Sequence, residues 1–215
     1  MAITLWGRPT SSNVQKVGWA LEELGVPYEQ IPLGGRHGGT GSPDYVAMNP
    51  NKLVPTLRDG GLVIWESHAI VRYLAARYGA MTLWREDVAE RAIVDQWTDW
   101  TATTFQPAWL AVFWLTVRTP VEKQDPAAIQ AALKTAANAF SILDAQLRDR
   151  AFVAGGSMSY GDIVVGAALY RWYTMDIQRP DTPNVEAYYR RIRDRPAYTK
   201  TVCVSYEELR ARSTP

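Results

Sequence analysis

Cysteine and histidine are the two residue types that this chain of 215 residues has least of. Cys203 is the single cysteine, which excludes an internal disulfide, a CxxC redox pair and a cysteine-based zinc site. His37 and His68 are the two histidines, too few for a histidine-rich metal centre. We therefore expect no resident metal ion.

An excess of either charge and a long apolar run are also lacking. The chain has 23 Lys and Arg against 22 Asp and Glu, a balance that argues against electrostatic binding of nucleic acid. No apolar run approaches the about 18 residues that suggest a membrane span. The first ten residues, MAITLWGRPT, do not have the basic and apolar regions of a signal peptide. We expect a cytoplasmic protein that does not bind nucleic acid or membranes.

Apolar and aromatic residues are plentiful. Hydrophobic residues make up 47% of the chain and charged residues 21%, which is typical of a globular protein. The length allows one or two domains with a sizeable core. Nine tryptophans and eleven tyrosines predict large aromatic surfaces in a core, a pocket or an interface.

The first part of the chain, residues 1–79, alternates strand-like and helix-like patterns. The order is strand, helix, strand, a glycine-rich loop over residues 34–41, and then two strands and a helix. The first strand–helix–strand unit predicts a parallel crossover, and Asp59-Gly60-Gly61 predicts a hairpin turn. The expected strands cover residues 3–6, 28–33, 55–58 and 62–65, and the expected helices cover residues 14–24 and 67–78.

Helical periodicity dominates from residue 86 onward. Pro107 predicts a kink or break in the first long helix, and Ser159 with Asp162 forms the sequence pattern of a capping box. We expect a linker over residues 80–85 and an all-helical domain over residues 86–215. The expected helices cover residues 86–118, 127–148, 160–169, 183–194 and 196–211.

Four motifs, each weak alone, form a specific signal through their order and spacing. They are Arg8-Pro9-Thr10-Ser11-Ser12-Asn13-Val14-Gln15-Lys16-Val17, Asn49-Pro50-Asn51-Lys52-Leu53-Val54-Pro55-Thr56-Leu57, Trp65-Glu66-Ser67-His68-Ala69-Ile70 and Ser159-Tyr160-Gly161-Asp162. With these motifs, nearly the whole chain resembles the cytosolic glutathione transferases, in particular bacterial serine-type members similar to the theta, phi and nu classes. The resemblance implies a thioredoxin-like α/β domain over residues 1–79, followed by the all-α domain. It also implies glutathione as co-substrate and a homodimer.

Ser11, Ser12 and Asn13 lie between the first strand and the first helix. Backbone N–H groups at a helix start have no helical partner, and the helix dipole there favours an anion. A thiolate is such an anion, and lowering a thiol pKa of about 8.5 by two units is worth ~2.7 kcal/mol. A serine here acts as a hydrogen-bond donor to the glutathione sulfur and not as a nucleophile.

The capping pattern separates the two serines. Ser12 has Gln15 at the position that completes a capping box, whereas Ser11 has Val14 there. We therefore predict that Ser12 caps the helix and that Ser11 donates to the thiolate, a choice with which the register of the resemblance agrees. Ser12 stays open as the alternative donor, and Asn13 is a second donor.

The resemblance implies that the glutathione backbone and its γ-glutamyl group bind at two motifs. Pro55 is expected to follow a cis peptide bond, so that the backbone of Val54 pairs with glutathione as an added strand. Glu66 is expected to bind the γ-glutamyl ammonium, while Ser67 caps a helix and binds the γ-glutamyl carboxylate.

The glycine end of glutathione has less clear candidates. Many family members carry Lys or Gln directly before the Val-Pro pair, where this chain has Leu53. Lys52, Arg36 and His37 are the substitutes, although a loop histidine or arginine is most often only solvated.

The helical part is expected to supply the pocket for the second substrate. The candidates are Thr10, Trp100, Thr104, Phe105 and Trp109. Aromatic residues at helical spacing are most often core residues, and spacing alone does not tell which of these face a cleft.

The function that the resemblance implies is glutathione transfer to hydrophobic electrophiles, without a metal ion. Two alternatives stay open. One is another glutathione-dependent reaction, namely disulfide reduction, peroxide reduction or isomerisation. The other is a non-catalytic protein that keeps the fold for ligand binding.

Overall fold

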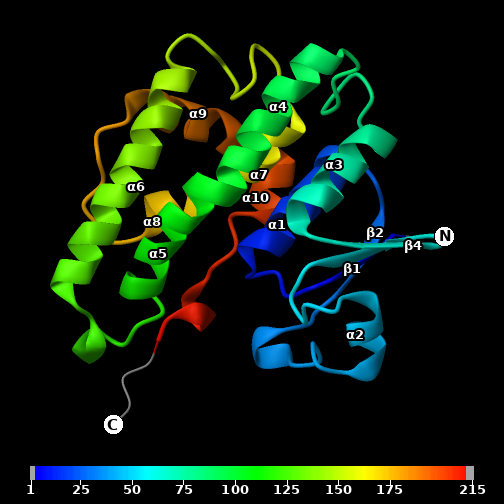
Figure 1. Cartoon of the computed structure of the whole chain (residues 1–215), viewed down its shortest axis with the longest axis horizontal. Coiled ribbons are helices and arrows are strands. Elements are labelled where there is room, and N and C mark those ends of the chain that lie inside the picture. The colour runs from blue at the N-terminus through cyan, green and yellow to red at the C-terminus, as the bar shows by residue number, and fades with distance from the viewer. Residues whose placement is uncertain (1–2, 212–215) are drawn as a thin grey trace.

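The computed structural model describes residues 3–211 and contains one four-stranded sheet with helices packed against it (Figure 1). The strand order is β2-β1-β3-β4. Strand β1 pairs in parallel with β2, whereas β3 runs antiparallel to both β1 and β4. The parallel crossover and the hairpin are therefore as predicted. The strands are β1 Ile3–Trp6, β2 Tyr28–Ile31, β3 Thr56–Asp59 and β4 Leu62–Trp65.

Helices α1, Ser12–Glu23, and α3, Ser67–Tyr78, pack against each other beside the sheet. Helix α2, Pro43–Met48, lies on the other side of the strands in Figure 1. Because β3 is antiparallel to both β1 and β4, these two strands run in the same direction. The helices that follow them, α1 and α3, therefore start at the same edge of the sheet. This edge carries the motifs singled out in the sequence.

The elements from Val88 onward are helical. They are α4 Val88–Trp100, α5 Gln106–Thr116, α6 Pro126–Leu147, α7 Tyr160–Gly166, α8 Leu169–Thr174, α9 Pro183–Arg193 and α10 Pro196–Thr201. Short 3-10 segments lie at Gly35–His37, Val121–Lys123 and Glu207–Leu209. None of the helices in the described part of the chain is long and apolar enough to cross a membrane.

Pro107 does not end the first long helix. Helix α4 continues into α5 through a π-helical segment, Thr101–Phe105. Pro107 has no N–H group and its ring crowds the carbonyl four residues earlier, so a wider turn accommodates it. In place of the expected break, the helix changes its type, and this change sets the direction in which Gln106 leaves the helix.

The predicted helix over residues 196–211 is wrong in its second half. Helix α10 ends at Thr201, where the chain enters a run of β-branched residues with low helix propensity, Thr201, Val202 and Val204. Residues 203–211, which we call the C-terminal strap, then run toward the end of α5, shown in red in Figure 1. The N–H of Ala211 donates to the carbonyl of Val117 at 2.8 Å.

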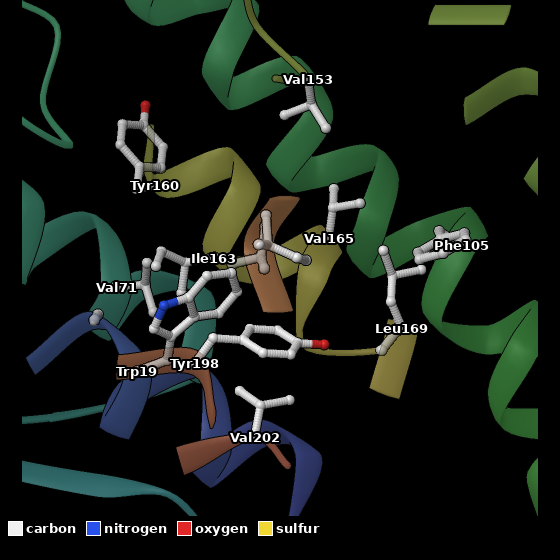
Figure 2. Packing of buried hydrophobic residues seen from close by; sticks show 14 of the residues in the cluster. Trp19, Val71, Phe105, Val153, Tyr160, Ile163, Val165, Leu169, Tyr198 and Val202 are labelled. Carbon is white, nitrogen blue, oxygen red and sulfur yellow. The ribbon is translucent and has the colours of Figure 1, made fainter. Parts of the chain in front are cut away.

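One hydrophobic core joins the sheet part to the helical part (Figure 2). Trp19 of α1 meets Tyr198 of α10 edge to face at 4.7 Å between ring centroids, and both side chains are fully buried. At Gly166 of α7, a Cβ would lie 2.7 Å from Ile192 and 3.0 Å from Trp19, so only glycine allows this close packing. These contacts of Trp19 fix the position of α1 relative to α7 and α10.

Candidate functional site at the start of α1

Ser11, and not Ser12, occupies the N-cap position of α1. Its backbone is extended, with φ −86° and ψ 122°, but its side chain makes no capping hydrogen bond. The prediction that Ser12 caps the helix is wrong because α1 begins at Ser12, and because Gln15 donates through Nε2 to the Pro9 carbonyl at 3.0 Å. Ser11 is half-buried, and its hydroxyl makes no hydrogen bond with any described residue, so it is available to a ligand.

Asn13 has an orientation that its neighbours fix. Its Oδ1 accepts a hydrogen bond from Lys16 Nζ at 3.1 Å and another from Gln106 Nε2 at 3.2 Å. Because both donors point to the same oxygen, the amide NH₂ group faces the other way. Asn13 lines one small cavity together with Val54, Pro55, Glu66 and Ser67. The amide group can therefore donate to a ligand in this cavity.

Lys16 is a buried cation directly behind Asn13. It is 2% exposed, donates to Gln106 Oε1, and lies 2.8 Å from His68 Nε2. Burial lowers the pKa of Lys16 to about 7, while Glu66 opposes this change. Burial, Lys16 and Arg72 together lower the pKa of His68 to about 2, so this imidazole is neutral and accepts the hydrogen bond from Lys16.

Sequence reasoning did not assign Lys16, His68 or Gln106 to the site. Lys16 carried a usable signal, since it is a charged residue between the apolar stripe positions Val14 and Val17. Gln106 carried none, because its approach to Asn13 depends on how the two parts of the chain pack and on the π-helical segment before it.

Glu66 holds a strained backbone at the start of α3. Its φ is 70°, in the left-handed region that a glutamate adopts at a cost of about 1–3 kcal/mol. It is the N-cap residue of α3, so the expectation that Ser67 is the cap is wrong: Ser67 is the first helical residue and is buried. The arrangement places an exposed carboxylate beside the free N–H groups of a helix start. A ligand that carries an ammonium and a carboxylate on one carbon can bind here, with its ammonium at the Glu66 carboxylate and its carboxylate at the free N–H groups.

The peptide bond between Val54 and Pro55 is cis, as predicted. The loop before it is held by Tyr45 Oη and Asn49 Nδ2, which donate to the Leu53 carbonyl at 2.6 and 2.9 Å. Among the described residues, the backbone N–H and C=O of Val54 form no backbone hydrogen bond. An extended peptide can therefore pair with them.

Lys52 and His37 are less closely tied to the cavity. Both are exposed, and neither lines it. Lys52 has a φ of 58°, and His37 lies in the 3-10 segment Gly35–His37 beside Arg36. Their contact with the glycine end of glutathione stays a prediction.

Two of the expected pocket residues belong to the core instead. Phe105 is 0% exposed and Trp109 is 1% exposed, so neither can line an open pocket. Phe105 packs between the half-buried Trp100, at 5.3 Å, and Phe140, at 4.9 Å between ring centroids. Helical spacing did not distinguish the core face from the outer face because aromatic residues occupy both.

The remaining three candidates have different surroundings. Trp100 is half-buried and stacks on Phe105. Thr104 is exposed on the π-helical segment. Thr10 is buried and donates its hydroxyl hydrogen bond to the Glu208 carboxylate of the C-terminal strap. A second cavity, of about 430 Å³, connects the two parts of the chain and includes Asn13, Glu66, Ala102 and Gln106. No group of three or more His, Cys, Asp or Glu residues within residues 3–211 could hold a metal ion.

The fold combines a thioredoxin-like sheet that carries a cis proline with a helical part, and one common core joins the two. The family model described as "Glutathione S-transferase, N-terminal domain" matches residues 1–76, and that described as "Glutathione S-transferase, C-terminal domain" matches residues 126–191. The chain belongs to the glutathione S-transferase family.

Individual relatives agree with this assignment. Glutathione S-transferase GstB of Escherichia coli (strain K12) is 43% identical over 204 residues, covering 94% of this chain and 98% of that protein. Glutathione S-transferase 3 of Zea mays is 31% identical, covering 93% of each chain. The theta class glutathione S-transferase from the citrus canker pathogen Xanthomonas axonopodis pv. citri, solved with glutathione bound, has a TM-score of 0.92 at 48% identity. It covers 95% of this chain and 98% of that one. The predicted fold class is confirmed.

Proposed function

We propose that this chain is a serine-type glutathione transferase that holds glutathione as a thiolate and joins it to hydrophobic electrophiles. The observation that carries the proposal is the single cavity in which Asn13, Val54, Glu66 and Ser67 meet. Asn13 supplies a hydrogen-bond donor for the sulfur, Val54 supplies backbone groups for the cysteinyl residue, and Glu66 with Ser67 supplies a site for the γ-glutamyl ammonium and carboxylate. The name and bound ligand of the Xanthomonas relative support this choice.

The γ-glutamyl group binds at the start of α3. Glu66 pairs with the ammonium, and the N–H groups and hydroxyl of Ser67 take the carboxylate. The cysteinyl backbone pairs with Val54, and the glycine carboxylate lies toward Lys52 and His37. This placement directs the cysteinyl sulfur to the start of α1.

The sulfur receives hydrogen bonds from Ser11 Oγ and Asn13 Nδ2 and lies at the positive end of the α1 dipole. All three favour the thiolate over the thiol, and the thiol proton passes to solvent. The thiolate then attacks the electrophilic carbon, and either a leaving group departs or the product takes up a proton. The contributions of the protein are an ionised nucleophile and proximity.

The proposal includes the arrangement of the whole protein. Residues 1–79 form the glutathione-binding domain, residues 80–85 the linker and residues 86–215 the domain that contacts the electrophile. The protein acts in the cytoplasm as a homodimer, a state that light scattering of the purified protein tests.

Three assays on purified protein test the function. We expect retention on a glutathione column, conjugation of 1-chloro-2,4-dinitrobenzene, and slower reduction of hydroxyethyl disulfide. Retention without turnover in either assay would contradict the proposal and favour a binding protein.

Disulfide reduction is the second candidate because Asn13 supplies an oriented amide donor beside a serine hydroxyl. In that reaction two glutathione molecules supply the two electrons, the substrate disulfide becomes two thiols, and glutathione disulfide is released. Cys203 is the single cysteine of the chain, and it lines neither of the two cavities that include Asn13. Faster disulfide reduction than conjugation would favour this candidate.

A further inference from the structure

Arg171 contacts the carbonyl of Thr10, the residue directly before Ser11, and Arg8 and Arg118 are the neighbouring cations that act on Arg171. We infer that Arg8, Arg118 and Arg171 form a subsite for a carboxylate, and that the electrophile this enzyme prefers carries one. The inference rests on the proposed function and narrows its substrate class, from hydrophobic electrophiles in general to aromatic electrophiles with an anionic group.

Arg171 of α8 is the most deeply buried of the three, at 3% exposed. One terminal nitrogen donates to the Thr10 carbonyl at 2.5 Å, while its buried Nε has no hydrogen-bond partner among the described residues. The guanidinium lies over the rings of Phe113 and Tyr206, at 5.0 and 5.8 Å. Burial, together with Arg8 and Arg118, lowers the pKa of Arg171 to about 10. This cation lies against the chain that presents Ser11.

Arg8 connects the cluster to the glutathione site. Its guanidinium packs against Gly35, where a Cβ would lie 3.0–3.2 Å from its atoms. At Gly34, a Cβ would lie 3.4 Å from both Arg8 and Val54, the residue expected to pair with glutathione. The buried Nε of Arg8 also has no partner among the described residues. Burial and Arg118 lower the pKa of Arg8, while Glu208 opposes them.

Arg118, just beyond the end of α5, completes the cluster. Its guanidinium lies 4.2 Å from the ring centroid of Trp114 and makes no hydrogen bond or ion pair with any described residue. It is close enough to Arg8 and Arg171 to lower the pKa of both. Like charges collected in a partly dry place destabilise one another unless an anion joins them.

Glu208 of the C-terminal strap places one carboxylate beside the cluster, near enough to act on Arg8. Its Oε1 accepts from the Thr10 hydroxyl, and its Oε2 pairs with Arg36 at 2.9 Å. One carboxylate, shared with Arg36 on the surface, leaves the three arginines with an excess of positive charge. A substrate carboxylate that replaces Glu208 compensates this charge, and the exposed ring of Trp114 beside Arg118 offers an apolar surface to its aromatic part.

The reaction we infer is an aromatic substitution. With 4-chloro-3-nitrobenzoate, the glutathione thiolate forms a bond to the carbon that carries chlorine, and chloride leaves with the electron pair of the broken bond. The carboxylate stays on the product and does not react. The carboxamide analogue, 4-chloro-3-nitrobenzamide, has the same leaving group and no charge, which makes it the matched control substrate.

The test compares kcat/KM for the two substrates, each divided by its uncatalysed rate with glutathione. We expect the wild-type protein to prefer the benzoate by about tenfold, as a charge-assisted hydrogen bond allows. Arg118→Gln should remove most of this preference and leave the benzamide rate unchanged, and Arg8→Gln should also reduce the preference. Glu208→Gln should raise the preference because it removes the internal competitor. Arg148→Gln, at the exposed end of α6, is the control that should change nothing.

The contrary results are distinct. No preference in the wild-type protein, or an equal loss on both substrates in the arginine variants, would overturn the inference. A raised KM for glutathione with an unchanged substrate preference would also overturn it, since the arginines would then hold the glycine carboxylate of glutathione.

Failure of the proposed function has a signature of its own. If neither substrate is turned over, the function fails, and calorimetry with unreactive 3-nitrobenzoate decides about the subsite. Binding that is lost in Arg118→Gln and kept in Arg148→Gln would support the subsite, and absence of binding to the wild-type protein would overturn it.

Discussion

Two donors of different kind are set at the start of α1, and single residues decide which of them acts on the sulfur. The Ser11 hydroxyl is free because the residue occupies the cap position without making the cap bond. The Asn13 amide is held in one orientation by Lys16 and Gln106. A free hydroxyl can rotate toward a ligand, whereas a fixed amide is already in place.

Exchanging the serines one at a time tests the choice between them. Ser11→Ala should raise the pKa of the bound glutathione thiol by about one unit, which corresponds to the loss of one hydrogen bond of ~1.4 kcal/mol. Ser12→Ala should leave both this pKa and the melting temperature nearly unchanged, because the buried Ser12 hydroxyl makes no capping bond. Thiolate ultraviolet absorbance and thermal unfolding measure the two effects. The opposite pattern would assign the sulfur to Ser12.

Lys16 acts on the thiol through Asn13 and as a buried charge. In Lys16→Met the amide of Asn13 loses one of its two fixed contacts, and the positive charge that Lys16 carries below its pKa of about 7 disappears. The pKa of the bound thiol should rise by about half a unit to one unit, measured by the same absorbance titration. Lys134→Met, at an exposed position of α6, is the matched control. An unchanged thiol pKa in Lys16→Met would show that Lys16 is only structural.

The motif residues could be predicted from the sequence because their roles depend on local backbone. Val54, Pro55, Glu66 and Ser67 meet in one cavity, which their strand and helix boundaries already imply. The predicted N-cap of α1, Ser12, is one residue later than the observed N-cap, Ser11. A helix start depends on which hydrogen bonds form around it, and the contact of Gln15 with Pro9 is not visible in a spacing rule.

Among the elements, α7 shows how a local pattern is completed by distant parts of the chain. Ser159 and Asp162 form the predicted capping box. The Asp162 carboxylate also accepts from the Val153 N–H at 2.9 Å and from Tyr188 Oη at 3.0 Å. The first pair could be predicted because it lies within one turn. The other two contacts require α9 and the loop after α6 to be in place.

Removing this carboxylate should destabilise the protein far more than loss of a cap alone. In Asp162→Ala, four buried donors lose their acceptor, and we expect a loss of about 3–5 kcal/mol in the free energy of unfolding. Urea unfolding measures it, with the exposed Asp149→Ala as control. A loss below about 1 kcal/mol would mean that the network contributes no more than an ordinary cap.

The order of the helices after Val88 could be predicted from the sequence, but which of their residues line a pocket could not. The pattern could not tell that Phe105 and Trp109 face the core, because helical spacing shows periodicity and not which face meets a neighbour. It also did not predict the π-helical segment, which brings Gln106 to Asn13. The helix predicted over residues 196–211 is too long for another reason: the β-branched residues after Lys200 favour an earlier end, and the strap's backbone contact at Val117 lies far away in the sequence.

At the scale of the whole molecule, the packing of α3 against the helical part buries His68 and makes stability depend on pH. Its folded pKa is about 2, against an ordinary 6.5, so between these values the unfolded chain binds a proton that the folded chain does not. Stability must therefore fall as the pH drops below about 6.5, at up to about 1.4 kcal/mol per pH unit.

His68→Gln should reduce this pH dependence. From pH 7.5 to pH 4.5 we expect the variant to lose about 2 kcal/mol less unfolding free energy than the wild-type protein. Urea unfolding at both values measures the difference, and the exposed His37→Gln should behave as wild type. Equal losses in His68→Gln and wild type would show that His68 is not held neutral in the folded state.

The common core explains why the candidate site forms only when the sheet part and the helical part are packed together. Trp19 and Tyr198 bring α10 onto α1, and Gln106 and Arg171 reach the start of α1 from the helical part. Sequence patterns predicted the two parts and their order because those depend on local periodicity. They did not predict the contacts between the two parts, in which Lys16, Gln106 and the three arginines take part.

The most direct test of the account is a crystal structure of the protein with saturating glutathione. We expect the tripeptide to pair with Val54, and its sulfur to lie within about 3.5 Å of both Ser11 Oγ and Asn13 Nδ2. A sulfur that points away from the start of α1, or an empty cavity at saturating glutathione, would contradict the account.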